Sequence, residues 1–72
     1  MNRKTMSNNA TGFGISIRRA RLGYGWTQEQ LAENAEVSRP SIARIEAGQD
    51  VSTATLTKVI DALHMVLRIE SA

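Results

Sequence analysis

The sequence predicts a mainly α-helical fold: a compact bundle of four to five helices followed by a short C-terminal β-strand. Apolar residues recur at helical spacing in four successive segments, and small polar residues of the kind that start helices precede two of them. After residue 64 the apolar spacing changes to alternation, which is typical of a strand. With 72 residues and no cysteine, the chain is expected to form one small domain that depends on helix packing and contains no disulfide.

Three parts are expected along the chain. Residues 1–10 are polar and lack any apolar period, so they are predicted to form a flexible basic arm. Residues 11–64 form the helical domain, and residues 65–72 contain the strand. No apolar run approaches the roughly 20 residues that cross a bilayer, and no apolar segment follows the basic start as it would in a secretory signal. We therefore expect a cytoplasmic protein without a membrane partner.

The first helix is predicted to start at Thr11 and to end at the glycines Gly23 and Gly25. Five residues fall on one face of this helix, namely Phe13, Ile17, Ala20, Arg21 and Tyr24. A charged residue on that apolar face is costly without a partner, and Glu46 is the expected partner of Arg21. Trp26, next to the glycine turn, is interpreted as a core residue.

The second helix is predicted to begin at Thr27, whose hydroxyl can accept from the amide of Gln30 while the Gln30 side chain reaches back. The third helix begins at Ser38, with Pro40 in its first turn, where a missing amide hydrogen has no intrahelical partner to lose. Gly48 lies where a left-handed helix end is expected. The residues of these two helices that should be buried are Leu31, Ala32, Ala35, Ile42 and Ile45.

The fourth helix is predicted over residues 54–63, with Leu56, Val59, Ile60 and Leu63 as its buried residues. Beyond it, Met65, Leu67 and Ile69 alternate with Val66, Arg68 and Glu70. No other strand is expected in this chain, so this one should pair antiparallel with its own copy in a twofold dimer. The expected dimer-interface residues are Met65, Val66, Leu67 and Ile69. The alternative is a fourth helix that continues to about residue 68.

The second and third helices begin close together, at Thr27 and Ser38. Two short capped helices joined by a turn of about four residues have the form of a helix-turn-helix, whose second helix lies in the DNA major groove. The outward face of the third helix suits this use, because small residues permit close approach and arginines donate to guanine or phosphate. That face comprises Arg39, Pro40, Ser41, Ala43, Arg44 and Ala47. The amides after Thr27 and the Gln28 side chain are expected to bind a phosphate.

Net charge supports an acidic partner only weakly, because the chain carries a formal charge of +2. The distribution of charge is more informative than its sum. Apart from Arg3 in the N-terminal arm, the first two thirds of the chain contain Arg18, Arg19, Arg21, Arg39 and Arg44.

The stretch RRARLGYGWTQEQLAENAEVSRPSIARIEAG resembles the Cro/repressor (Xre-type) helix-turn-helix family. The matching residues are Arg21, Trp26, Thr27, Gln28, Leu31, Ala32, Val37, Ser38, Ile42, Ile45, Glu46 and Gly48. The resemblance covers roughly residues 12–63 and implies a lambda-repressor-like bundle that binds operator DNA as a homodimer. It also implies phosphate contact by Thr27 and Gln28, base-edge reading by Ser38, Arg39, Pro40, Ser41 and Arg44, and an ion pair between Arg21 and Glu46. One departure is Glu36, at a turn position where the family usually has glycine.

Within this family, TLTKVIDAL followed by MVLRIES is most similar to the end of HipB-type antitoxins. That similarity implies the DNA-binding half of a toxin–antitoxin pair, which represses its own operon and binds a HipA-like kinase toxin. Two alternatives stay open: a stand-alone phage-type repressor, and a helical protein-interaction module without DNA affinity. Steep loss of affinity with rising salt distinguishes a DNA binder from the second alternative.

An enzyme is not expected. The only histidine, His64, follows the fourth helix, and no recognisable motif places a nucleophile near it or near Asp61. The pairs Gly12/Gly14 and Gly23/Gly25 are interpreted as turn glycines, since no strand precedes them and no lysine follows as in a phosphate loop. No cofactor or metal is expected. The predicted partners are operator DNA, a second copy of the chain and a HipA-like kinase toxin, which places the protein at the nucleoid.

Overall fold

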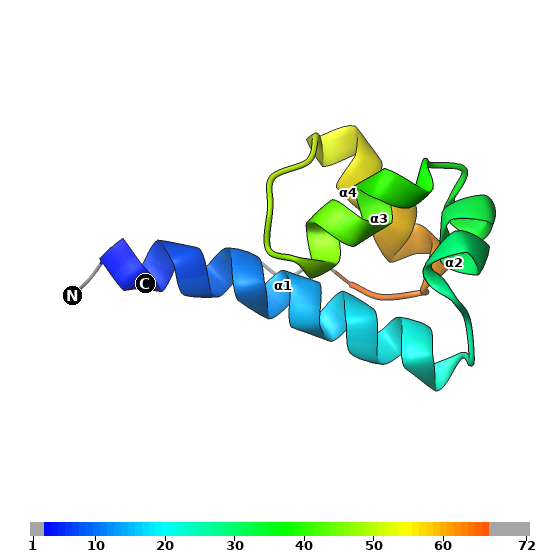
Figure 1. The fold of residues 1–72 in the computed structure, drawn as a ribbon, viewed down its shortest axis with the longest axis horizontal. Helices are drawn as coiled ribbons and strands as arrows, with labels where there is room; N and C mark the ends of the chain where they lie inside the picture. Colours follow the sequence, from blue (N-terminus) through cyan, green and yellow to red (C-terminus); the bar gives the residue numbers. More distant parts are fainter. Residues whose placement is uncertain (1–2, 67–72) are drawn as a thin grey trace.

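A computed structural model describes the backbone of residues 3–66 and the side chains of residues 12–66. Four helices make up this part of the chain: α1 (Arg3–Gly23), α2 (Gln28–Ala35), α3 (Arg39–Glu46) and α4 (Thr53–Ala62) (Figure 1). The predicted small, mainly helical fold is therefore confirmed, with four helices in the described residues. Residues 3–66 contain no strand.

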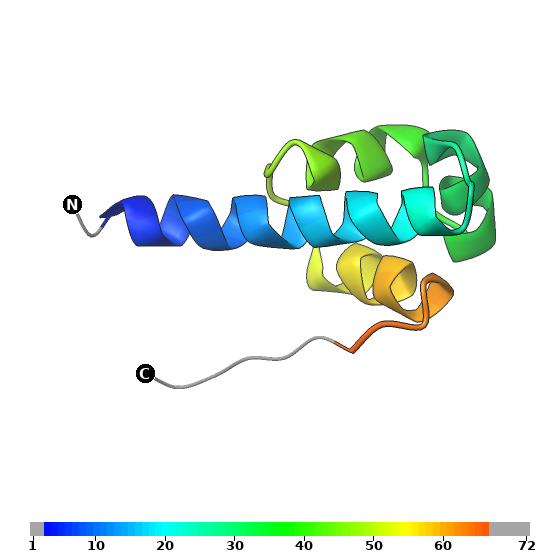
Figure 2. The same cartoon turned by 90° about the horizontal axis from the view of Figure 1, so that it is seen from below.

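The helices pack around one small core. α1 packs on α3, and α2 packs on both α3 and α4. Seen as in Figure 2, α1 crosses the front, with α3 above it and α4 below it. Each helix contributes one large side chain that is fully buried, namely Ile17, Leu31, Ile42 and Val59. The other buried apolar residues are Ala32, Ala35, Ile45, Ile60 and Leu63. The apolar faces predicted for α2 and α3 are confirmed, and so is that of α4 except at Leu56, which is only partly buried.

All four helices end in the same way. A residue one or two positions beyond the end of each helix takes the left-handed conformation, namely Gly25, Glu36, Gly48 and His64. The next amide then donates to a carbonyl five positions back, at 2.8–3.2 Å: Trp26 to Arg21, Val37 to Ala32, Gln49 to Arg44 and Met65 to Ile60. This hydrogen-bond pattern satisfies carbonyls at the helix end and reverses the chain. Glycine adopts the left-handed conformation freely, whereas each side chain there costs on the order of 1 kcal/mol.

The turn between α2 and α3 keeps this geometry without glycine. Glu36 has φ 59° and ψ 44°, and its amide donates to the carbonyls of Ala32 and Glu33. The departure from the family pattern at this position therefore leaves the turn conformation intact.

The structure corrects two expectations about the first helix. α1 begins at Arg3 and not near Thr11, so the glycines Gly12 and Gly14 lie inside it and are not turn glycines. Phe13 and Tyr24 are 41% and 45% exposed, although both were predicted on the buried face. Gly14 lies on that face instead, since α1 approaches α3 there at close range.

The chain after α4 also differs from the expectations. α4 ends at Ala62, so the alternative of a helix that continues to about residue 68 is wrong. Met65 packs against the core and Val66 is exposed, and neither belongs to a strand. Leu67 and Ile69 lie outside the described residues, so the predicted strand and its pairing across a dimer have no support here.

We predict that Gly14→Ala destabilises the fold by about 1–3 kcal/mol. A Cβ at this position would collide with the carbonyl oxygen of Ile45 and lie 3.0 Å from that of Glu46. Gly12→Ala is the matched control, because its added Cβ would meet no atom within 4 Å beyond the neighbouring backbone of its own helix. The control should stabilise α1 by about 0.5–1 kcal/mol through helix propensity. Denaturant unfolding of both variants checks the prediction, and changes of the same sign would contradict it.

Candidate nucleic-acid interface

The N-terminus of α2 is closed by a complete capping box. The Thr27 hydroxyl accepts from the amide of Gln30 at 3.0 Å, and the Gln30 side-chain oxygen accepts from the amide of Thr27 at 2.8 Å. The amide of Thr27 is therefore already paired. The amides that follow it, at Gln28 and Glu29, lie in the first turn, where a helix leaves backbone donors without intrahelical partners.

The N-terminus of α3 is capped by Ser38. Its hydroxyl oxygen accepts from the amide of Ser41 at 3.2 Å and lies 2.9 Å from the Ser41 hydroxyl. The side chain of Ser38 therefore serves the helix start, and a hydrogen bond between two hydroxyls orients Ser41. Arg39, Pro40 and Arg44 are exposed, on the face of α3 opposite the buried Ile42 and Ile45.

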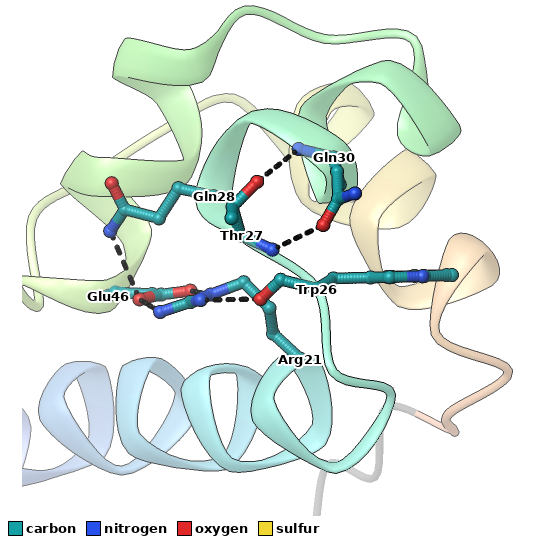
Figure 3. Close-up of polar contacts among 6 residues, drawn as sticks. All are labelled: Arg21, Trp26, Thr27, Gln28, Gln30 and Glu46. Carbon is teal, nitrogen blue, oxygen red and sulfur yellow. Dashed lines mark hydrogen bonds and ion pairs between the residues drawn. The ribbon is translucent and has the colours of Figure 1, made fainter.

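A hydrogen-bonded cluster joins the end of α1, the start of α2 and the end of α3 (Figure 3). Arg21 forms a two-pronged ion pair with Glu46, in which Nε lies 2.7 Å from Oε2 and Nη2 lies 3.0 Å from Oε1. Arg21 also donates a third hydrogen bond, from Nη1 to the carbonyl of Trp26 at 2.8 Å. The Arg21 and Glu46 side chains are only 9% and 5% exposed, so the two charges are held together away from bulk water. Hydrogen bonding to Glu46 raises the pKa of Arg21 above its ordinary value, against the opposing effect of burial.

Gln28 belongs to the same cluster, a contact that the sequence analysis did not anticipate. Its Nε2 donates to Glu46 Oε1 at 3.2 Å. Gln28 and Glu46 lie on different helices, and their separation depends on the angle between α2 and α3, which residue spacing does not encode. The contact orients the Gln28 amide group at the N-terminus of α2 and leaves the second hydrogen on Nε2 available for another acceptor.

Trp26 connects this cluster to the core. Its ring stacks on that of Tyr24, with centroids 4.6 Å apart and planes 15° apart, and it packs against the buried residues. The Tyr24 hydroxyl donates to the carbonyl of Leu63 at 3.0 Å, which ties the end of α1 to the end of α4. Trp26 therefore lies with the core, and its carbonyl fixes the Arg21 guanidinium.

The structure brings the predicted site residues together in two groups. Thr27 and Gln28 lie at the start of α2. Ser38, Arg39, Pro40, Ser41 and Arg44 lie on α3 or at its N-cap. Arg21 and Glu46 contact Gln28 of the first group and connect α1 to the end of α3. No cluster of His, Cys, Asp and Glu in the described part of the chain could hold a metal ion, and no described helix is long and apolar enough to cross a membrane.

Two short capped helices joined by a tight turn, with Arg39 exposed in the first turn of the second helix and Arg44 in its last, have the form of a helix-turn-helix. A family model described as helix-turn-helix, HTH_3, matches residues 17–66, which is more than half of the chain. The protein therefore belongs to this Xre-type helix-turn-helix family, which supports a role as a DNA-binding transcription regulator. No curated protein matches the chain.

We predict that Glu46→Ala destabilises the fold by about 3 kcal/mol, because Arg21 would keep a nearly buried charge without its carboxylate. Glu46→Gln should cost less, since one acceptor for the guanidinium remains. The control is Glu33→Ala on the exposed side of α2, which should change stability by less than about 0.5 kcal/mol. Thermal and denaturant melts measure the stability of all three variants. Equal losses of stability for Glu46→Ala and Glu33→Ala would show that the ion pair between Arg21 and Glu46 contributes nothing to stability.

Proposed function

We propose that this protein is a sequence-specific transcription repressor that binds a palindromic operator as a homodimer. The observation that carries the proposal is the cluster of Arg21, Glu46 and Gln28, which holds the start of α2 and the end of α3 in one fixed relation. A reading helix must be held rigidly against the backbone-contacting helix for base contacts to fall in register.

In this proposal the start of α2 contacts a phosphate. The amides of Gln28 and Glu29 and the second hydrogen on Gln28 Nε2 supply the donors. Thr27 can donate its hydroxyl hydrogen to the same phosphate, because in the capping box the hydroxyl oxygen only accepts a hydrogen bond, whereas the Thr27 amide is already paired. These contacts set the position of the domain on the duplex and carry no sequence information.

The exposed face of α3, from Arg39 in its first turn to Arg44 in its last, reads the base edges. Arg39 and Arg44 are the candidates for paired donation to guanine, and Ser41 can donate or accept. Pro40 offers only apolar contact, of the kind that suits a thymine methyl group. Ser38 holds the helix start and sets how close the first turn comes to the groove.

A homodimer is proposed because one domain of this size presents a single reading helix. Two copies related by a twofold axis would place their α3 helices about 34 Å apart, one turn of DNA, on a palindromic site. The segment proposed to join them is the alternating one from Met65 to Glu70, whose interface residues are Met65, Val66, Leu67 and Ile69.

We further propose that the repressor is the antitoxin of a HipBA-like pair, which binds a HipA-like kinase toxin and represses its own operon. The support is the similarity of TLTKVIDAL and MVLRIES to the end of HipB-type antitoxins. A kinase-like reading frame next to this gene, whose product co-purifies with the protein at fixed stoichiometry, is the expected result. A phage-type neighbourhood without a kinase would instead favour a stand-alone repressor.

We predict that Arg39→Ala weakens operator binding by about 1–3 kcal/mol and relaxes base preference at one position in each half-site. Gln28→Ala should weaken binding to all sequences about equally, because it removes a phosphate contact. Arg19→Ala on α1 removes the same charge as Arg39→Ala and serves as its control. Titrations against a panel of operator variants at several salt concentrations test all three.

Two outcomes would contradict these assignments. If Arg39→Ala left the ranking of operator variants unchanged, its role in base reading would be wrong. If affinity did not fall steeply with rising salt, the protein would be a helical interaction module and not a DNA binder.

We predict that truncation after Val66 yields a monomer that binds a palindrome less tightly than the full chain does. The truncated chain keeps Met65, which packs against the core, so loss of the dimer is separated from loss of the fold. Analytical sedimentation and an operator titration measure the two effects, with a thermal melt as the check on folding. A folded, truncated protein that stays dimeric would rule out a dimer held by this segment.

A further inference from the structure

The outward side of α1 is rich in exposed apolar side chains. Of the five large apolar side chains that are exposed in residues 12–66, four lie on α1 or directly after it, namely Phe13, Ile15, Leu22 and Tyr24. Figure 2 shows α1 in front of the other helices, with no described element covering its near side. Phe13 lines a surface groove and Tyr24 stacks on Trp26, so these two have contacts within the domain. Ile15 and Leu22 belong neither to the core nor to the apolar residues packed against it.

Ile15 and Leu22 lie almost on one line along α1. At about 100° per residue, a separation of seven brings the second side chain to within about 20° of the first, two turns further on. Arg18 and Arg19 lie between them, one about 50° to each side of this line. All four side chains are exposed. These four residues, which we call the α1 stripe, therefore present two apolar contacts flanked by two cations.

The charge of the α1 stripe is not balanced within its own helix. The sequence of α1 contains no Asp or Glu. The one ion pair in the described residues joins Arg21, on the buried face of α1, to Glu46. Solvated arginines are common on helices, and single exposed apolar residues are normal. The combination is more specific, because it complements a surface that carries apolar side chains between carboxylates.

Charge and burial argue against the other occupants that this protein suggests. A second copy docked stripe to stripe would place arginines against arginines. The acidic helix α2 of a second copy exposes Glu29 and Glu33 but no large apolar side chain, so it would leave Ile15 and Leu22 uncovered. DNA would accept both arginines, but its phosphate backbone offers no apolar contact to two aliphatic side chains.

We propose that the α1 stripe is a docking site for an acidic amphipathic helix of another protein. The apolar side chains of that helix pack on Ile15 and Leu22, and carboxylates on both sides of them pair with Arg18 and Arg19. The contact area is small, so binding is weak and reversible. The proposal does not rest on the proposed function, since none of the four residues is among the proposed DNA contacts or dimer-interface residues.

A synthetic helical peptide tests the site. The peptide repeats the spacing of the α1 stripe, with leucines in place of Ile15 and Leu22 and glutamates in place of Arg18 and Arg19. Fluorescence anisotropy measures its binding to the full chain at low ionic strength, where exposed ion pairs are strongest. Two control peptides, one with glutamine for the glutamates and one with alanine for the leucines, should each bind on the order of tenfold more weakly.

Variants of the protein test the same contacts from the other side. Arg18→Ala/Arg19→Ala and Ile15→Ala/Leu22→Ala should each weaken binding of the glutamate peptide on the order of tenfold. Lys58→Ala removes an exposed cation from α4 and is the matched control, which should leave binding unchanged. Arg18→Glu/Arg19→Glu should bind a peptide with lysines in place of the glutamates. Thermal melts check that these surface variants fold as the parent does.

Three kinds of result would overturn the proposal. If the glutamate peptide did not bind, or if Lys58→Ala weakened it as much as Arg18→Ala/Arg19→Ala, the stripe would not be a specific site. If the paired arginine change weakened operator binding on the order of tenfold, the stripe would contact DNA. If Ile15→Ala/Leu22→Ala turned a dimer into a monomer in sedimentation, the stripe would be an interface between copies. The peptide titration contains no DNA, so its failure is distinct from failure of the proposed repressor function.

Discussion

The ion pair between Arg21 and Glu46 is the interaction on which the rest of the structure depends. The core has one large, fully buried side chain from each helix, and burial of apolar surface has no preferred direction. Such a core can hold four helices together without fixing the angles between them. The guanidinium supplies direction, because its donors have a fixed planar geometry and reach Glu46 on α3 and the carbonyl of Trp26 before α2. The two charges are stable in this position only while they remain together.

The close approach at Gly14 and the ion pair constrain the same contact from two sides. Gly14 lies against the carbonyls of Ile45 and Glu46 at the end of α3. About two turns further along α1, Arg21 forms its ion pair with the Glu46 side chain. Backbone contact fixes the distance between the helices, whereas the ion pair fixes their rotation. The orientation of α3 is therefore set by α1, which itself contributes none of the proposed base contacts.

Sequence patterns predicted the helix starts and the buried faces of α2, α3 and α4, because these depend on neighbouring residues. The caps at Thr27 and Ser38 are local hydrogen bonds, and apolar periodicity marks the buried faces directly. On α1 the pattern identified the buried Ile17 and Arg21 and the partly buried Ala20, but it wrongly placed Phe13 and Tyr24 on the same buried face. An exposed Phe13 and a buried Gly14 invert the usual preference, and only the distance between α1 and α3 explains it. The bond from Gln28 to Glu46 was missed for the same reason, since it depends on the angle between two helices.

The exposed charges on α2 and α3 would orient the domain on DNA more than they would raise its overall attraction to DNA. α3 exposes Arg39 and Arg44, whereas the acids Glu29, Glu33 and Glu36 are exposed on or directly after α2. With a net charge of +2, long-range attraction to DNA is weak, and the acidic side of α2 repels any approach that presents it first. Glu29 also lies in the first turn of α2, where it stabilises the helix dipole but opposes a phosphate. The proposed phosphate contact therefore depends on the Gln28 side chain as its donor. The hydrogen bond from Gln28 to Glu46 holds that side chain in place.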